Sequence, residues 1–319
     1  MKEIYTIAKN SFMELLRQPV FLILTAAASA FIVFLAVTPY FGLGDDVKLV
    51  KTSTMAVLLV AGLFTAVISA TSSLADELKG GTALAVLSKP VSRLSFLLGK
   101  LLGVCGGLAV MVYINAIAIL LASRMGYDAY GGTDKVGMTI FYLAMMLAFA
   151  IAAFINYFLE RNFVSNAVGA LLVMLTLAFI LISFFDEHWM VQKFAEGTDW
   201  NMIPAIVCLL FMLWLIAALA ITCSTRLDAV ATLSVCIILL MVGLVSDHFF
   251  GRLADAGSWI GSILYAVIPN WQNFWLADAI EGEKGIPWLY IGHAFTYMAC
   301  FMAAVIAIGF CMFDNRELS

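Results

Sequence analysis

Charged side chains are scarce in this sequence of 319 residues, since Asp, Glu, Lys and Arg make up only 12% of it and hydrophobic residues make up 64%. Water-soluble domains contain roughly 25% charged and about 45–50% apolar residues. A soluble globule with so few charged side chains could not cover its apolar surface, and it would aggregate. The composition therefore excludes a soluble enzyme, a disordered protein and a disulfide scaffold, and it leaves a polytopic membrane protein.

Motifs for disulfide formation, metal binding and nucleotide binding are missing as well. The sequence has no Cys-x-x-Cys pair and no His-Glu-x-x-His, and its three histidines, His188, His248 and His293, lie far apart. Gly99–Lys100 lacks the earlier glycine and the following Ser or Thr of a phosphate-binding loop. We therefore expect no catalytic residues, no metal site and no bound cofactor in this chain. The absence of a basic run also argues against nucleic acid as a partner.

Long apolar runs are what the sequence does contain. A bilayer core of about 30 Å takes about 20 helical residues, and runs of this length indicate about eight spans. The predicted spans cover residues 20–41, 53–75, 98–123, 137–159, 163–185, 203–224, 229–246 and 288–312. The predicted fold class is an all-α integral membrane protein, a polytopic helical bundle that forms a single transmembrane domain over residues 1–319.

The distribution of lysine, arginine and tryptophan indicates an orientation. With both termini in the cytoplasm, ten of the 17 lysines and arginines lie on the cytoplasmic side and the other seven lie outside. Most tryptophans then lie in or beside two long outer segments, where indole rings favour headgroup depth. One of these is the extracytoplasmic segment 247–287, in which we expect a helix on or in the outer leaflet that ends before Pro269.

Ionisable side chains are absent from the interior of the predicted spans. Ion-coupled carriers usually keep such groups there, despite a cost of about 2.5–3.5 kcal/mol or more each. The nearest candidates are Asn115, Asn156 and His293, and side chains of this kind more often bond to a neighbouring helix than bind an ion. The pattern disfavours a secondary, ion-coupled transporter, which stays as the alternative function.

Two tight hairpins share a pattern. Residues 159–173 and 224–238 each place an arginine, Arg161 or Arg226, in a turn of a few residues between two spans. Such turns need polar tips to stay in water, so the pattern alone does not establish an internal duplication.

The most informative segment is the predicted cytoplasmic loop 76–97, DELKGGTALAVLSKPVSRLSFL. Gly80–Gly81 interrupt the preceding helix, Thr82 can cap a short helix, and Pro90 ends it. Ser92 can cap the helix that leads into the next span. A short, half-apolar helix held below the membrane by two corners fits insertion into a groove on a cytoplasmic partner.

This loop resembles the coupling segment of ABC-2 type permeases, the membrane subunits of ATP-binding-cassette exporters of the type V class. The family pattern is a Glu, Gly-Thr four residues later, a leucine-rich short helix, Pro-x-x-Arg, and a Gly-Lys that enters the next span. The matching residues are Glu77, Gly81–Thr82, Leu84, Leu87, Pro90, Arg93 and Gly99–Lys100. Segment 1–18 resembles the family's interfacial elbow helix, with an apolar stripe of Ile4, Ala8, Phe12, Leu15 and Leu16. The resemblance is strongest over about residues 1–125, and the family plan has six spans where about eight are predicted here.

The resemblance implies a permease subunit that moves substrate across or out of the membrane with ATP hydrolysed by a separate nucleotide-binding subunit. That subunit would bind ATP and Mg, and it would dock on the loop at Asp76, Glu77, Gly81, Thr82, Leu84, Leu87, Lys89, Pro90 and Arg93. A second permease chain, identical or related, and the bacterial cytoplasmic (inner) membrane are also implied. A non-transporting subunit of a maturation or assembly complex is a further alternative.

Small residues mark one face of the helix after this loop. Gly99, Gly103 and Gly107 give this predicted span a flat face that allows close helix packing. The partner helix could belong to the same chain or to the second permease chain.

Overall fold

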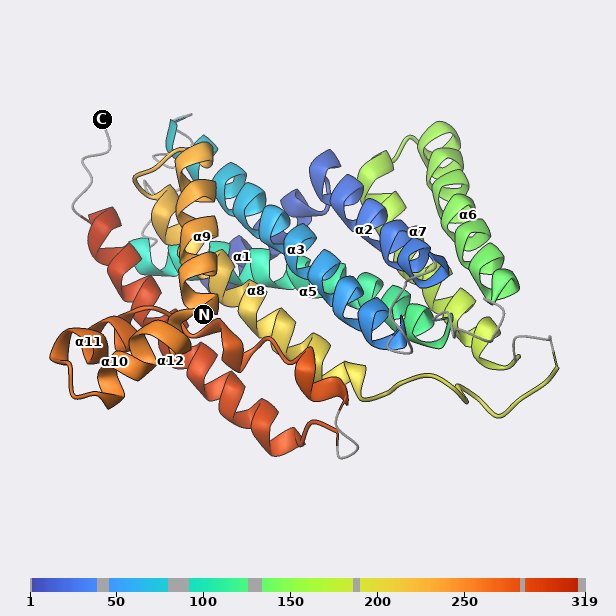
Figure 1. The fold of residues 1–319 in the computed structure, drawn as a ribbon. Coiled ribbons are helices and arrows are strands. Elements are labelled where there is room, and N and C mark those ends of the chain that lie inside the picture. Colours follow the sequence, from blue (N-terminus) through green and yellow to red (C-terminus); the bar gives the residue numbers. More distant parts are fainter. Residues whose placement is uncertain are drawn as a thin grey trace.

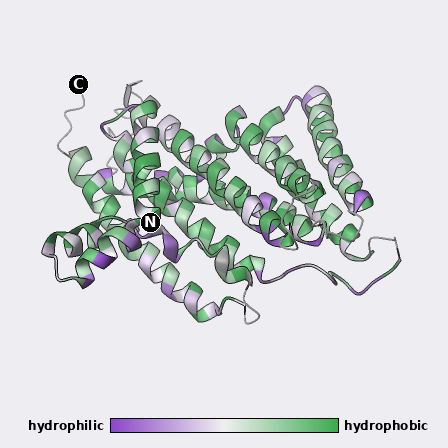
Figure 2. Cartoon of the chain, viewed as in Figure 1, coloured by the Kyte–Doolittle hydropathy of each residue, from purple (hydrophilic) through white to green (hydrophobic). Residues whose placement is uncertain are grey.

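The structure, a computed structural model, describes residues 2–38, 46–79, 92–125, 134–185, 190–281 and 285–314. Within these ranges the chain is almost entirely helical, and the β pairing is limited to an isolated bridge between Phe185 and Val191. Figure 2 shows apolar residues along the helices and hydrophilic residues mostly at helix ends and in connecting segments. The predicted all-helical membrane fold is confirmed.

The helices follow one another along the chain, most of them through short connections (Figure 1). The α-helices are α1 (Lys2–Leu15), α2 (Pro19–Val37), α3 (Asp46–Lys79), α5 (Arg93–Met125), α6 (Lys135–Leu159), α7 (Phe163–Ser183), α8 (Met202–Ser224), α9 (Ala229–Leu244), α10 (Arg252–Asp255), α11 (Trp259–Val267) and α12 (Trp288–Asp314). A π-helix, η1 (Asp247–Gly251), joins α9 to α10, and two 3-10 helices, η2 (Trp271–Asn273) and η3 (Asp278–Glu281), precede α12.

Within the described residues, 7 helices are long and apolar enough to cross a membrane, and the count reaches 8 if α9 and η1–α10 form one bent span. The bend between these two pieces is 51°. The first span is shorter than predicted, because α2 ends at Val37 and Thr38 is extended. Thr38 precedes Pro39, and the residue before a proline disfavours the helical conformation.

The bundle has two ends, defined by the helices that meet there. At one end, called here the loop end, α3 ends and α5 begins, and the carboxyl ends of α8 and α12 lie beside the start of α5. At the opposite end, called here the far end, α3 and α8 begin and α5 and α7 end. Because α1 packs on the first half of α5, the first and the last described helices both reach the loop end.

The spanning helices differ greatly in how much of their surface the protein covers. In α5 and α8, 72% of the residues in the most apolar 18-residue stretch are buried inside the protein, and in α3 the share is 67%. The share falls to 28% in α6 and 22% in α12, and Figure 1 shows these two helices on opposite sides of the molecule. The core therefore consists of α3, α5 and α8, while the outer helices leave wide apolar surfaces for lipid or another chain.

The segment that follows α11 folds back against the bend in α9. Trp271 is fully buried, lies against Gly243, and donates a hydrogen bond from Nε1 to the Leu239 carbonyl at 3.0 Å. Gln272 donates from Nε2 to the Leu244 carbonyl at 2.9 Å. The Leu244 carbonyl is among the last four of α9, which have no partner within the helix, so Gln272 satisfies it, and Trp271 adds a second hydrogen bond to the same part of the bent span.

Candidate functional site

The predicted docking residues surround the gap between α3 and α5. Asp76 and Glu77 belong to the last turns of α3, and Arg93 is the first residue of α5. The other predicted docking residues lie outside the described residues, and they are Gly81, Thr82, Leu84, Leu87, Lys89 and Pro90. The structure thus defines the two helices that flank the loop, and the short helix within the loop stays a prediction.

Arg93 contacts the last turn of α12. The start of α5 is capped as expected, because the Ser95 N–H donates to Ser92 Oγ at 3.1 Å. Arg93 Nη1 donates to the Phe313 carbonyl at 3.0 Å, and its guanidinium lies 5.6 Å from the centroid of the Phe313 ring. The Phe313 ring in turn stacks on Phe96, with centroids 6.2 Å apart. The start of α5 and the end of α12 therefore form one packed unit.

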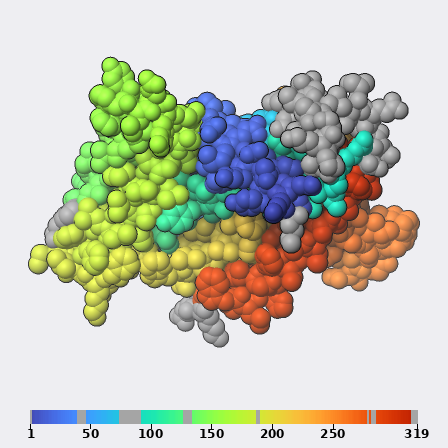
Figure 3. Space-filling model, turned by 180° about the vertical axis from the view of Figure 1, so that it is seen from behind, coloured from blue at the N-terminus to red at the C-terminus, as the bar shows by residue number. Residues whose placement is uncertain are grey.

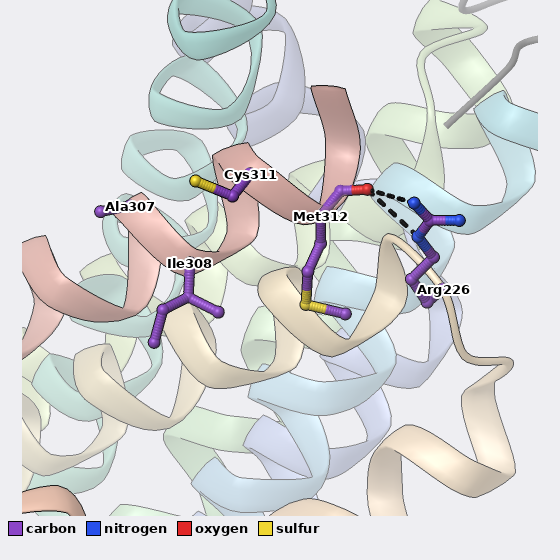
Figure 4. A pocket seen from close by; sticks show the side chains of 5 residues that line it. All are labelled: Arg226, Ala307, Ile308, Cys311 and Met312. Carbon is purple, nitrogen blue, oxygen red and sulfur yellow. Dashed lines mark hydrogen bonds between the residues drawn. The ribbon is translucent and has the colours of Figure 1, made fainter. Parts of the chain in front are cut away.

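Arg226 binds the same end of α12 from another side. It follows α8, and its Nε and Nη2 donate to the Met312 carbonyl at 3.1 and 2.7 Å (Figure 4). Nearby, Thr222 Oγ1 donates to the Val305 carbonyl at 3.1 Å. The last carbonyls of a helix lack intrahelical partners and carry the negative end of its dipole, so two arginines are favourable there. The sequence shows only an arginine in a turn directly after a span, which does not tell which helix it caps.

The glycine face of α5 packs against α1. A Cβ atom at Gly99 would lie 2.7 Å from Ile7 Cβ, and one at Gly103 would lie 2.5 Å from Ser11 Cβ. A Cβ atom at Gly107 would lie closer still to the side chain of Leu15. Figure 3 shows the N-terminal residues on the surface of the molecule, between α6–α7 and α12. The partner of this face is therefore a helix of the same chain.

Lys100 strengthens the contact between α1 and α5. Its side chain is only 4% exposed, although it lies within a helix that crosses the bundle. Nζ lies 3.6 Å from Glu14 Oε2 on α1 and 5.8 Å from the centroid of the Phe96 ring. Both residues of the Gly-Lys pair thus bind α1 to α5, since Gly99 allows close approach of the helices and Lys100 supplies an ion pair.

A buried ion pair joins three helices at the far end. Arg124, at the end of α5, donates to the carbonyls of Ile182 and Phe185 at the end of α7. Its Nη2 lies 3.5 Å from Asp134 Oδ2, and Asp134 caps α6 by accepting from the Gly137 N–H at 2.7 Å. The Arg124 and Asp134 side chains are 6% and 2% exposed. This arrangement fixes the far ends of α5, α6 and α7 together.

Polar side chains inside the spans make hydrogen bonds within the protein. Ser29 Oγ donates to Asn115 Oδ1 at 3.2 Å, which links α2 to α5, and Asn115 Nδ2 donates to the Met111 carbonyl. Asn156 donates to a backbone carbonyl in the turn between α6 and α7, and His293 is exposed on α12. Asn115 and Asn156, two of the three candidates considered for ion binding, thus have ordinary structural partners.

A polar hollow opens between η1, α10 and α11. Its volume is about 580 Å³, and Asp247, Arg252 and Asp255 are among the residues that line it. Tyr265 donates from its hydroxyl to Asp247 Oδ1 at 3.0 Å. Throughout the part of the chain that the structure describes, no three His, Cys, Asp or Glu side chains come together in a group that could hold a metal ion.

Comparison with known families gives a match. The model of the ABC-2 family transporter protein matches residues 5–190, which is more than half of the chain. The chain belongs to the ABC-2 transporter family. No curated protein matches it in sequence. As an ABC-2 family member it is an integral, multi-pass membrane protein of the permease type, and association with an ABC ATP-binding subunit is general in this family.

The ABC-2 match covers more of the chain than the sequence resemblance indicated. It runs from α1 through α7, and thus extends well beyond residue 125. Two helices outside the match contact helices within it, because α8 belongs to the buried core and α12 is bound by Arg93 of α5. The carboxyl-terminal helices therefore pack on the helices that the family match covers.

Proposed function

We propose that this chain is the permease subunit of an ABC-2 type transporter, driven by a separate ATP-binding subunit that docks on loop 76–97. The family match over residues 5–190 carries this proposal, because it includes the whole loop. The order Glu77, Gly81–Thr82, Pro90 and Arg93 supports the same site for docking. The cytoplasmic membrane of a bacterium, with both termini in the cytoplasm, is the location that fits this role.

The lengths of the two flanking helices support a mechanical role for the loop. With 34 and 33 residues, α3 and α5 are each about 50 Å long at about 1.5 Å per residue. A bilayer core is about 30 Å thick, so both helices extend well beyond it. A displacement at the loop would therefore reach the membrane through two continuous helices.

Contacts at the loop end would spread this displacement to other helices. Lys100 connects α5 to Glu14 of α1, and Arg93 connects α5 to Phe313 of α12. ATP-driven movement of the docked subunit would therefore shift α1, α5 and α12 together. We propose that substrate passes between this chain and a second permease chain, identical or related, since the thinly covered face of α6 leaves room for such a neighbour.

The test is copurification with the cognate ATP-binding subunit. Leu84→Asp, or Glu77→Arg, should leave the permease in the membrane but abolish copurification and ATP-dependent flux in proteoliposomes. A matched control is Lys193→Glu, which reverses an exposed charge in the segment before α8, at the far end.

Two results would refute the proposal. One is that binding and flux both survive the loop substitutions. The other is that the purified chain transports by itself under an ion gradient alone, which would establish the secondary transporter instead.

A further inference from the structure

A second hollow lies at the loop end, beside the carboxyl end of α12. It has a volume of about 460 Å³, and Figure 4 shows the residues that line it. They are Arg226, Ala307, Ile308, Cys311 and Met312. Four of the five come from α12 and are uncharged, so the hollow is an apolar surface with a single cation at its edge.

The cation is bound to the carboxyl end of α12. The guanidinium of Arg226 donates from Nε and Nη2 to the Met312 carbonyl, at 3.1 and 2.7 Å. These bonds use only part of its five N–H donors, and within the described residues it has no carboxylate partner. The Arg226 side chain is exposed, so its remaining donors are accessible. A planar guanidinium of this kind is suited to bind a phosphate through two parallel hydrogen bonds.

The surroundings of the hollow restrict the class of ligand. Only 22% of the residues in the most apolar 18-residue stretch of α12 are buried in the protein, and Ile308 is 57% exposed. The face of α12 that carries Ile308 therefore meets hydrocarbon in a membrane. The hollow lies where α12 ends, and an arginine at the end of a span lies near the lipid headgroups. An apolar surface with a phosphate-binding group at its headgroup end matches the two parts of a phospholipid.

We propose that this hollow binds an anionic phospholipid from the leaflet at the loop end. The headgroup phosphate accepts hydrogen bonds from Arg226, and the first part of an acyl chain lies over Ala307 and Ile308. A volume of about 460 Å³ holds this region of a lipid rather than the whole molecule. The proposal depends only on the chain crossing a membrane, so it stands or falls separately from docking of an ATP-binding subunit.

The experiment measures lipid retained by the purified full chain in native mass spectrometry. Dioleoyl phosphatidylglycerol is compared with dioleoyl phosphatidylcholine, and inorganic phosphate is added in a separate arm. We expect the wild-type chain to prefer phosphatidylglycerol by about fivefold, the contribution of a single well-placed arginine. Arg226→Gln should remove this preference, and Arg226→Lys should keep part of it, because the charge remains and the planar fork is lost.

Two further variants separate the charge from the hollow. Arg161→Gln removes an equivalent exposed arginine in the turn between α6 and α7, and the preference should persist. Ala307→Phe fills the hollow without changing any charge, and the preference should fall as in Arg226→Gln. The second variant also keeps the proposal testable if Arg226→Gln does not accumulate.

Three outcomes would overturn the proposal. Equal losses in Arg226→Gln and Arg161→Gln would mean a general surface-charge effect. Displacement of the lipid by inorganic phosphate at similar concentration would mean a site for a free anion. A change in oligomeric state caused by Ala307→Phe, with lipid binding unaltered, would mean that a second copy covers the hollow.

Discussion

Arginine side chains bind helix carboxyl ends at both ends of this bundle, but in different surroundings. At the far end, Arg124 is 6% exposed, binds the end of α7, and also has the buried carboxylate of Asp134 as a partner. At the loop end, Arg226 is exposed and binds only a carbonyl of α12. Breaking a buried ion pair leaves an uncompensated charge, whereas an exposed hydrogen bond can exchange with water. The contacts of Arg124 at the far end should therefore resist displacement more strongly than the contact of Arg226 at the loop end.

This difference agrees with the proposed mechanism. A transporter driven from one side needs helices that stay together at a fixed point and shift at the driven end. The ion pair between Lys51 and Asp199, with Nζ and Oδ2 2.5 Å apart, adds a second fixed point at the far end. The four predictions below test the contrast, beginning with the largest expected effect.

Substituting Arg124 should give the greatest loss of stability. Arg124→Met leaves the Asp134 carboxylate buried without a cation and should lower the free energy of unfolding by about 3–5 kcal/mol. Denaturant unfolding in detergent measures this change. Lys193→Met removes an exposed cation near the same end and serves as the control.

A second substitution distinguishes the buried charge from simple loss of packing. Adding Asp134→Asn to Arg124→Met removes the stranded charge, and its amide oxygen can still cap α6, so part of the stability should return. No recovery in the double variant would show that the ion pair does not account for the rigidity of the far end.

The glycine face of α5 should give the next largest effect. Gly103→Leu forces a side chain into the backbone and side chains of α1, and overpacking of this kind costs about 1–3 kcal/mol. The measurement is protease cleavage within α1, which should become faster when α1 is displaced. Gly169→Leu is the matched control, because no atom lies within 4 Å of a Cβ built at Gly169. Equal cleavage in both variants would show that α1 is not held by this face.

The sequence predicts the spans well, because an apolar run of about 20 residues has few other uses. It does not predict the bend after α9, since that depends on Trp271 and Gln272, which lie far along the chain and supply hydrogen bonds at the bend. The first predicted span, 20–41, is too long, because Thr38 precedes Pro39 and leaves the helical conformation. Local signals thus determine where the helices lie and where they end, whereas distant side chains determine where a span bends.

The candidate site could be predicted only in part, because some of its contacts are local in sequence and others join distant helices. The predicted Ser92 cap of α5 is confirmed, because capping depends on neighbours in sequence. The partners of Arg93 and of the glycine face are on α12 and α1, and spacing within one helix cannot identify them. The docking residues between Gly81 and Pro90 rest on the family resemblance and stay predictions.

Substituting an arginine at the loop end should lower the stability less than substituting Arg124 at the far end. Arg93→Gln removes the hydrogen bond to the Phe313 carbonyl and the contact of the guanidinium with the Phe313 ring, and the expected loss is about 1–2 kcal/mol, because the side chain is only half-buried. Hydrogen exchange should become faster in the last turn of α12 and stay unchanged in α7. Arg161→Gln is the control for loss of an exposed arginine. A loss as large as that of Arg124→Met would refute the contrast between the two ends.

The smallest effect should come from the middle of the bundle, where Ser29 and Asn115 join α2 to α5. Hydrogen bonds between helices in a membrane contribute about 0.6 kcal/mol on average, because each group finds other partners when the contact is lost. Ser29 can turn its hydroxyl to a carbonyl of its own helix, so Ser29→Ala and Asn115→Leu, combined in a double-mutant cycle, should show a coupling of about this size. Flux driven by ATP should persist in both variants. A loss of transport without a loss of stability would instead make Asn115 part of an ion or substrate path. That result would favour the ion-coupled alternative over a bundle whose interior polar groups only hold the helices in place.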